Sequence, residues 1–459
     1  MKKIIVPASL AAVACLGQSA VSAAEKPNIL IILADDLGYA DLGFQGAKDI
    51  PTPNIDALAK SGTIFTDAHV SASVCSPSRA GLMTGIYQQR FGHEANCPPP
   101  DKGMDVKQKT LADYLKSLGY RTGVIGKWHL GDKDKFHPLK RGFDYFYGFR
   151  EGGRPYFHNA KKIDKKGNPR AIEKNWEQVS FDGYLTDVFG EKAVEFLESS
   201  ATAGKPFFLY LAFNAPHSPY QAKDEDLAFF AGKIKNKRRR VYAAMVYALD
   251  RAIGRVMKTL DAKKLRGNTL VFFLSDNGGP PRTGALNTPL NGSKGIDFEG
   301  GIRVPFIVSW PGHFPSGKKC AAVVSSLDIA PTCLSVAGSA PPKKLVGENL
   351  FEIVKNGKRD HSLFWRKLYF GAVRLGPWKL IEVDGYGYAL YNLEKDLGES
   401  ENLSKKMPEK LAQLKAIYER WRKTLVEPLW GEGGKWKRIN VKRHINLIEG
   451  KPELDKIKY

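Results

Sequence analysis

The sequence has few cysteines, five in 459 residues, and fewer acidic than basic residues, 48 against 70. It has no internal repeat and no low-complexity tract, which argues against solenoid, fibrous and disordered chains. Beyond residue 24 no apolar run is long enough to cross a bilayer, so we expect no transmembrane segment in the mature chain. The hydrophobic content of 43% instead predicts a folded protein with one large core and a smaller unit.

The few cysteines leave little room for disulfides. Cys15 lies in an N-terminal segment that we expect to be removed, which leaves Cys75, Cys97, Cys320 and Cys333. Four cysteines in an exported protein could form two bridges. If Cys75 has a chemical role of its own, at most one bridge remains. Cys320 and Cys333 are then the closer pair in the sequence, which does not establish that they are joined.

The N-terminus has the layout of a secretory signal peptide. Lys2 and Lys3 precede an apolar run over residues 4–21, and small residues follow it. We expect residues 1–23 to be the signal peptide and the protein to be secreted or periplasmic. A membrane anchor is disfavoured because Pro7 and Gly17 interrupt the run. A lipoprotein attached at Cys15 is also disfavoured, because the usual Leu three places before that cysteine is missing.

The excess of basic residues gives a formal charge of +22. Much of it falls in residues 233–240 and in the tail after residue 430. Such charge attracts anionic partners, although each run could also be ordinary solvated surface. We expect no nucleic-acid partner, because the chain carries an export signal and no known nucleic-acid-binding module. A sulfated polymer would suit both the charge and the compartment.

Four short apolar runs, each followed by polar residues, predict buried parallel strands at residues 29–33, 122–125, 207–213 and 270–274. Helical patterns lie between them at 110–118, 188–197 and 241–260, so we predict an α/β layered sheet domain over residues 24–350. Ligands bind beyond the carboxyl ends of such strands. There the sequence places the following polar residues: Asp35, Asp36, Lys127, His129, His217, Asp276 and Asn277.

The rest of the chain divides into smaller segments. Residues 150–180 predict a long surface loop beside the polar edge of the sheet. Residues 351–430 predict a C-terminal subdomain, in which β-like runs at 370–373, 378–383 and 389–393 form a small antiparallel sheet that a helix at 408–425 covers. We expect residues 431–459 to be a basic, irregular tail.

Residues 75–85 read Cys-Ser-Pro-Ser-Arg-Ala-Gly-Leu-Met-Thr-Gly, and this segment resembles the signature of the type I, formylglycine-dependent sulfatases. In that family Cys-x-Pro-x-Arg marks a cysteine for oxidation to formylglycine (3-oxoalanine). Pro77 suits the first turn of a helix, so Cys75 should lie at a helix N-terminus, where backbone N–H groups favour an anion. Met83 stands where Leu is more usual, a mild change on a packing face.

Further blocks occur in the family's order. They are Gly-Lys-Trp-His-Leu-Gly at 126–131, Ala-Pro-His-Ser-Pro at 215–219, Gly-Ser-Lys-Gly at 292–295 and Glu-Gly-Gly-Ile-Arg-Val-Pro at 299–305. The resemblance runs from Pro-Asn-Ile at 27–29 to Tyr-Asn-Leu at 391–393. It implies an alkaline phosphatase-like fold and hydrolysis of a sulfate ester. Alternation along an extended segment would place Lys127 and His129 on one side.

The resemblance also implies a role for each site residue. A formylglycine hydrate at position 75 carries two hydroxyls, one to attack sulfur and one to expel sulfate, which divides a hard step into two. Arg79 would steady that hydrate. Lys127 and Lys294 would hold sulfate oxygens. Asp276 would activate the attacking hydroxyl, His217, with or without Lys294, would protonate the leaving alcohol, and His129 would deprotonate the second hydroxyl.

Asp35, Asp36, Asp276 and Asn277 offer hard oxygen donors, which suit Ca²⁺ or Mg²⁺. Taken alone, either pair is equally well read as a turn or a helix cap. The resemblance implies that they form a metal site, with Ca²⁺ as the ion and the nucleophile at position 75 completing its coordination. It further implies a formylglycine-generating or anaerobic sulfatase-maturating enzyme as a partner during biogenesis. The positive charge, the export signal and the long loop beside the site together predict a sulfated glycan as substrate.

Two other functions fit the same residues. A phosphate or phosphonate monoester hydrolase could use the same fold and metal site, because fold alone does not fix the substrate. A non-catalytic polyanion-binding protein would explain the charge but not the full set of chemical groups. Six residues near the catalytic blocks are candidate substrate contacts, each of which could equally be an ordinary surface residue: Arg90, His93, Glu94, Arg150, Arg154 and His158.

Overall fold

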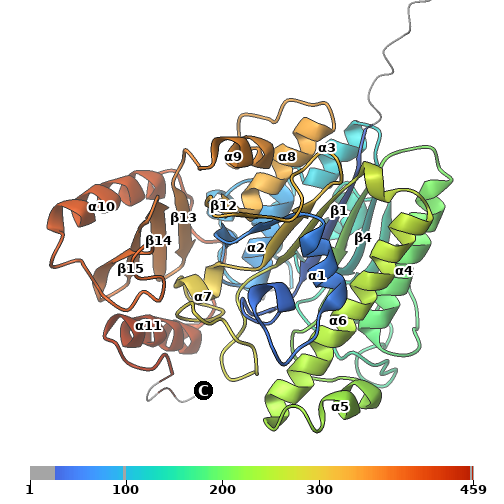
Figure 1. The fold of residues 1–459 in the computed structure, drawn as a ribbon, viewed down its shortest axis with the longest axis horizontal. Coiled ribbons are helices and arrows are strands. Elements are labelled where there is room, and N and C mark those ends of the chain that lie inside the picture. Colours follow the sequence, from blue (N-terminus) through green and yellow to red (C-terminus); the bar gives the residue numbers. More distant parts are fainter. Residues whose placement is uncertain (1–25, 97–99, 455–456, 458–459) are drawn as a thin grey trace, which may run out of the picture.

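The computed structural model describes residues 26–96, 100–454 and 457, so the expected signal peptide and Cys97 lie outside the described residues. Most of the chain is built around one mixed sheet (Figure 1). Its strands follow the order β11-β2-β10-β9-β1-β8-β4-β5-β6-β7. Their bounds are β1 Asn28–Ala34, β2 Thr63–Phe65, β4 Arg121–Lys127, β5 Tyr145–Phe149, β6 Glu173–Lys174, β7 Glu177–Gln178, β8 Phe207–Ala212, β9 Thr269–Ser275, β10 Phe306–Ser309 and β11 Lys318–Cys320.

The centre of the sheet is parallel. β1 pairs with β8 on one side and with β9 on the other, and β4 pairs with β8. These strands are the four apolar runs of the sequence, and nearly all of their residues are buried, as expected when both faces of a sheet are covered. Their carboxyl ends therefore meet at one edge. The prediction of an α/β layered domain is confirmed.

Helices cover both faces. One face packs against α4 (Leu185–Ala201) and α6 (Lys237–Ala262), which lie side by side. The other packs against α2 (Cys75–Thr84), α3 (Leu111–Ser117), α8 (Ile329–Val336) and α9 (Leu350–Asn356). The remaining elements of this part are α1 (Pro53–Lys60), α5 (Asp224–Phe230), α7 (Glu299–Ile302) and a two-stranded sheet of β3 (Ala68–His69) and β12 (Val324–Ser325).

A four-stranded antiparallel sheet follows, as the sequence predicted. It consists of β13 (Leu363–Lys367), β14 (Phe370–Leu375), β15 (Trp378–Val383) and β16 (Gly387–Asn392). Val373, Leu380 and Leu390 pack on one of its faces against α10 (Pro408–Arg422).

The tail is where the sequence prediction is wrong. Residues 431–459 were expected to be irregular, but α11 spans Gly434–Ile448. Leu447 and Ile448 pack against the face of the small sheet that α10 leaves open, together with Ile296 and Phe298. Helix α11 therefore lies opposite α10 across this sheet (Figure 1).

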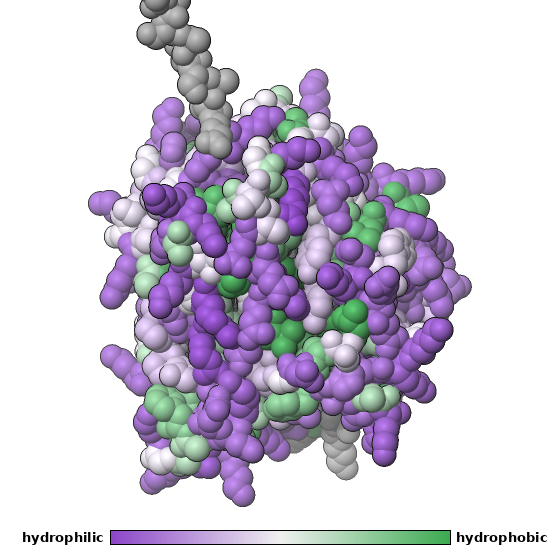
Figure 2. Space-filling model, turned by 90° about the vertical axis from the view of Figure 1, so that its right-hand side faces the viewer, coloured by the Kyte–Doolittle hydropathy of each residue, from purple (hydrophilic) through white to green (hydrophobic). Residues whose placement is uncertain are grey.

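Among the described residues, no helix is long and apolar enough to cross a membrane. Figure 2 shows the side of the molecule that lies on the right in Figure 1, where most of the visible surface is hydrophilic and the hydrophobic patches are small and scattered. The described cysteines Cys75, Cys320 and Cys333 are all free, so no bridge joins Cys320 to Cys333.

The basic run at 233–240 is only partly surface. Arg239 is buried at the start of α6 and forms ion pairs with Asp41 and Asp49. The predicted loop at 150–180 is irregular apart from the short strands β6 and β7.

Candidate active site

The aspartates at the end of β1 lie beside the Asp-Asn pair at the end of β9. Ala34 pairs with Ser275 in the parallel register, so Asp35 and Asp276 are the next residues on neighbouring strands. The backbone N–H of Asp36 donates to Oδ1 of Asp276 over 3.2 Å. All these carboxylates are buried. Asp36 has a backbone φ of 66°, a left-handed conformation that Asp adopts more readily than most residues.

Cys75 is the first residue of α2 and faces this pair. Its Sγ lies 3.4 Å from Oδ1 of Asp35, 3.8 Å from Oδ1 of Asp36 and 3.1 Å from Nζ of Lys294. Burial raises the pKa of the Cys75 thiol well above its usual range, and the charge of Asp276 adds to the effect. The side chain is therefore a neutral thiol rather than a thiolate, which is the reactive form of cysteine.

Three cations, the buried Lys127 and Arg79 and the partly buried Lys294, neutralise the three carboxylates. Lys127 Nζ lies 2.7 Å from Asp35, and Lys294 Nζ lies 2.6 Å from Asp36. Arg79 donates through Nη2 to Asp276 over 2.8 Å and through Nη1 to the carbonyl oxygen of Lys127. Isolated buried charges are costly, so this pairing is what allows three acids and three bases to share one site.

The pKa values of the acids differ although the acids are neighbours. Burial would raise the pKa of Asp36, but Lys294, His217 and Lys127 outweigh it and bring that pKa well below its usual range. Burial and the charge of Asp35 raise the pKa of Asp276 to about 6, against the opposing effect of Arg79. Asp276 is thus the acid that can exchange a proton near neutral pH.

Two histidines complete the site. His217 approaches Asp36, with 3.7 Å between Nε2 and Oδ2. Its Nδ1 lies 2.7 Å from the carbonyl oxygen of Ser218. Since a carbonyl can only accept, Nδ1 carries the proton, and Nε2 is the nitrogen that faces the site. Burial lowers the pKa of His217 to about 3.

His129 is buried, and neither ring nitrogen has a hydrogen-bond partner among the described residues. Burial and the nearby Lys127 bring its pKa well below the usual range. Strand β4 ends at Lys127, and His129 has a φ of 58°, so simple strand alternation does not place these two side chains. His129 nevertheless lies close enough to Arg79, Lys294 and His217 for their charges to act on it.

The donor set fits a hard dication. One ligand atom each from Asp35, Asp36, Cys75 and His217 lies within 4.8 Å of the others. The Oδ1 atom of Asn277 is buried without a hydrogen-bond partner among the described residues, while its Nδ2 donates to Asp36. An unpartnered buried amide oxygen next to carboxylates is the kind of group that Ca²⁺ or Mg²⁺ accepts as a ligand.

Several supporting contacts could not be found from the sequence. The Oγ of Ser76 donates to the carbonyl oxygen of His129 over 2.7 Å and lies 2.6 Å from Nε2 of His93. Asn96 accepts from the Ser76 N–H at the first turn of α2. Tyr156 donates to the carbonyl oxygen of His217. These contacts fix the backbone around the catalytic blocks, and no motif marks them.

The six candidate substrate contacts have internal partners instead. His93 bonds Ser76, and Glu94 accepts from the guanidinium of Arg366. The others lie against neighbouring side chains: Arg90 near the Tyr87 ring, Arg150 on Asp134 and Glu173, and Arg154 and His158 on Asp164.

The family model described as Sulfatase matches residues 27–339, and the model described as N-sulphoglucosamine sulphohydrolase, C-terminal, matches residues 293–424. The chain belongs to the sulfatase family. The earlier resemblance is thereby confirmed, and the protein is an enzyme that hydrolyses sulfate esters. A role limited to binding polyanions is excluded.

Relatives and solved structures agree with this family. The chain is 35% identical to dog N-acetylgalactosamine-6-sulfatase over 79% of its own length and 73% of the relative's. It is 33% identical to rat arylsulfatase G over 84% of both chains. The crystal structure of Ps i-CgsB in complex with k-i-k-neocarrahexaose matches 92% of this sulfatase and 99% of that chain, with 40% identity and a TM-score of 0.85.

Proposed function

We propose that this sulfatase removes sulfate from a sulfated oligo- or polysaccharide, and that its nucleophile is formylglycine made from Cys75. The observation that carries the nucleophile is the position of Cys75 at the start of α2, between Asp35, Asp36 and Lys294, with a thiol whose pKa is raised by burial. The carbohydrate class rests on the relatives, whose names include an amino-sugar sulfatase and a structure bound to a carrageenan oligosaccharide.

Formylglycine would supply, once hydrated, two hydroxyls on one carbon, one for attack on sulfur and one for release of sulfate. Arg79 would orient this group from within α2. Asp276, with a pKa of about 6, would accept the proton of the attacking hydroxyl. His129, which has two unpaired nitrogens among the described residues, would accept the proton of the second hydroxyl.

Lys127 and Lys294 would bind the sulfate oxygens. In this structure their ammonium groups bond to Asp35 and Asp36, so both already lie at the site. His217 would protonate the leaving alcohol through Nε2, because Nδ1 is held by the carbonyl oxygen of Ser218. An anionic substrate beside His217 would raise its pKa and favour that protonation.

Asp35, Asp36, Asp276 and Asn277 would hold a divalent cation, Ca²⁺ or Mg²⁺, together with the group at position 75. The cation would supply positive charge next to the transferring group and polarise it. With three carboxylates and three protein cations in balance, a bound dication would leave the site with excess positive charge. The charge of the loaded site then supports binding of one monoanionic ester.

The tests follow from Cys75 and the metal. Mass spectrometry of the peptide that contains residue 75 should find the aldehyde in place of the thiol. Cys75→Ala should abolish release of sulfate without unfolding the protein.

A matched phosphate ester should be turned over far more slowly than the sulfate ester. An unmodified thiol in a fully active enzyme, or full activity after exhaustive chelation, would contradict the nucleophile or the metal respectively.

We also propose that the protein is exported, because residues 1–23 have the pattern of a signal peptide. A formylglycine-generating enzyme or an anaerobic sulfatase-maturating enzyme would then act on the chain during its biogenesis. N-terminal sequencing of the protein recovered from its native host should begin near Ala24, and a chain that still begins at Met1 would contradict export by cleavage.

A further inference from the structure

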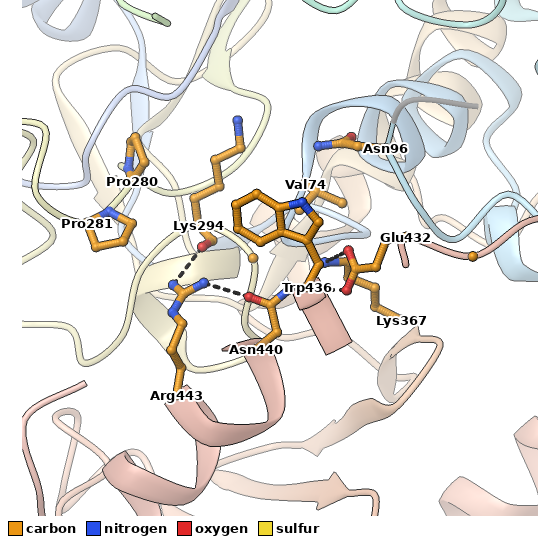
Figure 3. Close-up of a pocket in the computed structure, with 12 residues that line it drawn as sticks. Val74, Asn96, Pro280, Pro281, Lys294, Lys367, Glu432, Trp436, Asn440 and Arg443 are labelled. Carbon is orange, nitrogen blue, oxygen red and sulfur yellow. Dashed lines mark hydrogen bonds and ion pairs between the residues drawn. The ribbon is translucent and has the colours of Figure 1, made fainter. Parts of the chain in front are cut away.

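A cavity of about 460 Å³ opens beside Lys294, and helix α11 forms one of its walls (Figure 3). Lys294 contributes to both the cavity and the catalytic cluster, because its Nζ lies 3.1 Å from Cys75 Sγ. Val74, the residue before Cys75, also lines the cavity, and Pro280 and Pro281 line it as well. The volume falls in the range of pockets that bind small molecules.

Helix α11 presents three different faces. Trp436, Asn440 and Arg443 follow a spacing of four and three residues, and all three line the cavity. A second face, which includes Val441, Ile445 and Ile448, packs on the small sheet. A third face carries the exposed residues Lys435, Arg438 and Lys442. The exposed basic residues of α11 therefore belong to its outer face, whereas Arg443 lines the cavity.

The charged side chains that line the cavity are paired with protein groups. Lys367 Nζ lies 2.8 Å from Glu432, and Arg443 Nε lies 2.8 Å from Oε1 of Glu453. Arg443 also donates to the carbonyl oxygen of Lys294 and to Asn440, as Figure 3 shows. Since Lys294 is paired with Asp36, the lining residues offer no surplus positive charge to a second anion.

Trp436 is the large apolar group of this wall. Its side chain is 48% exposed although it lies at the mouth of a cavity next to the catalytic cluster. In Figure 3 its indole extends from α11 toward Lys294 and Val74. The C–H groups of a sugar ring carry partial positive charge and match the negative face of an indole.

We propose that Trp436 stacks on an uncharged pyranose ring that is linked to the sulfated sugar, so that the cavity is a subsite for the neighbouring residue of a glycan chain. The proposal rests on the function proposed above. With the sulfate at Lys294, the next ring of the chain enters the space between Trp436 and the two prolines. The paired charges make this subsite favour a ring without its own sulfate.

The test compares substrates across matched variants. For a sulfated oligosaccharide with an unsulfated neighbouring sugar, Trp436→Ala should lower kcat/KM about tenfold or more, and Trp436→Phe should restore most of it. For a sulfated monosaccharide or an aryl sulfate, Trp436→Ala should leave kcat/KM unchanged. Phe229→Ala, which removes another exposed aromatic side chain, on α5 and outside the cavity lining, is the control and should change kcat/KM on neither substrate more than twofold.

The outcomes separate the subsite from the proposed function. Equal losses on small and long substrates would make Trp436 a structural residue and overturn the subsite. No loss on the oligosaccharide would overturn it as well. A neighbouring sulfate that raised kcat/KM in the wild type and lost that gain in Trp436→Ala would overturn the preference for an uncharged ring. If the wild type hydrolysed aryl sulfates but no sulfated sugar, this result would contradict both the proposed function and the subsite.

Discussion

Burial, together with the charge of the neighbouring Asp35, determines the charge of Asp276. Lysines lie on Asp35 and Asp36, whereas burial and the field of Asp35 raise the pKa of Asp276 to about 6. A group that titrates near neutral pH and that, in the proposed mechanism, is both the base and a metal ligand would link proton binding to cation binding.

This linkage predicts that the affinity for Ca²⁺ falls as the pH falls. Below about pH 6 Asp276 is protonated, so a cation must displace a proton to bind, and affinity for Ca²⁺ should fall by up to about tenfold for each further pH unit. Above that pH the carboxylate is ionised and affinity should level off. Calorimetric titration of the substrate-free protein with Ca²⁺ between pH 5 and 7.5 measures this. Asp276→Asn should bind more weakly and lose the pH dependence; an affinity equal at pH 5 and 7 in the wild type would contradict the assignment.

The backbone at Gly152 lies against the ring of His129. A Cβ at Gly152 would be 2.5 Å from Nε2 of His129, closer than real atoms approach, so Gly152→Ala should displace the imidazole. Because small misplacements of catalytic groups cost up to about a hundredfold in rate, kcat should drop by tenfold to a hundredfold while the melting temperature stays close to wild type.

The adjacent glycine supplies the control for that variant. A Cβ at Gly153 would be 3.3 Å from Cε1 of His217, which requires only a small adjustment. Gly153→Ala should therefore cost much less than Gly152→Ala in a kcat measurement. Equal kcat values for both variants and the wild type would show that the position of His129 is not critical.

At the scale of secondary-structure elements, the sequence predicts the strands and helices that hydrophobic periodicity and turn residues mark. Long apolar runs mark β1, β8 and β9, and the polar residues after them are brought to one edge by the parallel register. Helix α11 escapes such prediction because its apolar residues are sparse and its cavity face carries Trp, Asn and Arg. Its helical state depends on packing against the small sheet, which is a tertiary contact that no local pattern shows.

Tertiary contacts that no local pattern shows also explain why the internal partners of the six candidate substrate contacts could not be predicted. Arg154 and Glu94 lie near the catalytic blocks in sequence, but Arg154 pairs with Asp164 and Glu94 pairs with Arg366, partners that only the fold brings close. A residue's closeness in sequence to the catalytic blocks does not show which side chain it contacts in the folded protein. Lys127 and Lys294 could be identified because family motifs surround them.

The small sheet is joined to the catalytic part by a buried ionic cluster. Lys379 on β15 is fully buried, and its Nζ lies 2.9 Å from Glu299 of α7 and 2.8 Å from Glu399. Burial raises the pKa of Glu399 to about 7, and the charge of Glu299 adds to this, against Lys379. Helix α7 follows Lys294 closely in the chain, so this cluster supports one border of the active site.

Removing the lysine should therefore affect both stability and turnover. Lys379→Met leaves two buried carboxyl groups together, and breaking such a pair typically costs about 3–5 kcal/mol. Glu399 can take up a proton, so the loss should be smaller at pH 6 than at pH 8. Thermal denaturation at both pH values measures this, with the exposed Lys395→Met as control. Equal melting temperatures for the two variants would show that the cluster does not hold the parts together.

At the scale of the whole molecule, the charge of +22 acts at a distance. A sulfated polysaccharide reaches the exposed basic residues outside the cavity, including those on the outer face of α11, whereas an aryl sulfate meets only the catalytic groups. We therefore expect kcat/KM to be higher for sulfated glycans than for aryl sulfates.

Ionic strength distinguishes the contribution of the remote basic residues from that of the catalytic groups. Raising ionic strength from about 0.05 to 0.5 M shortens the reach of surface charge to a few ångströms, so kcat/KM on the polysaccharide should fall several-fold while that on the aryl sulfate changes little. Initial rates on both substrates over this range measure the effect. Replacing Lys435, Arg438 and Lys442 by Gln should flatten the salt dependence, and an equal dependence for the two substrates would show that remote charge plays no part.

The burial of α2 also fixes an order of events in time. All ten of its residues, from Cys75 to Thr84, are buried, and Arg79 lies bonded to Asp276 beneath them. An enzyme that must grasp the segment around Cys75 cannot reach it once the native fold has formed. In the proposed mechanism, oxidation of Cys75 would therefore precede folding, and a chain that folded before it was modified would stay inactive until it unfolded again.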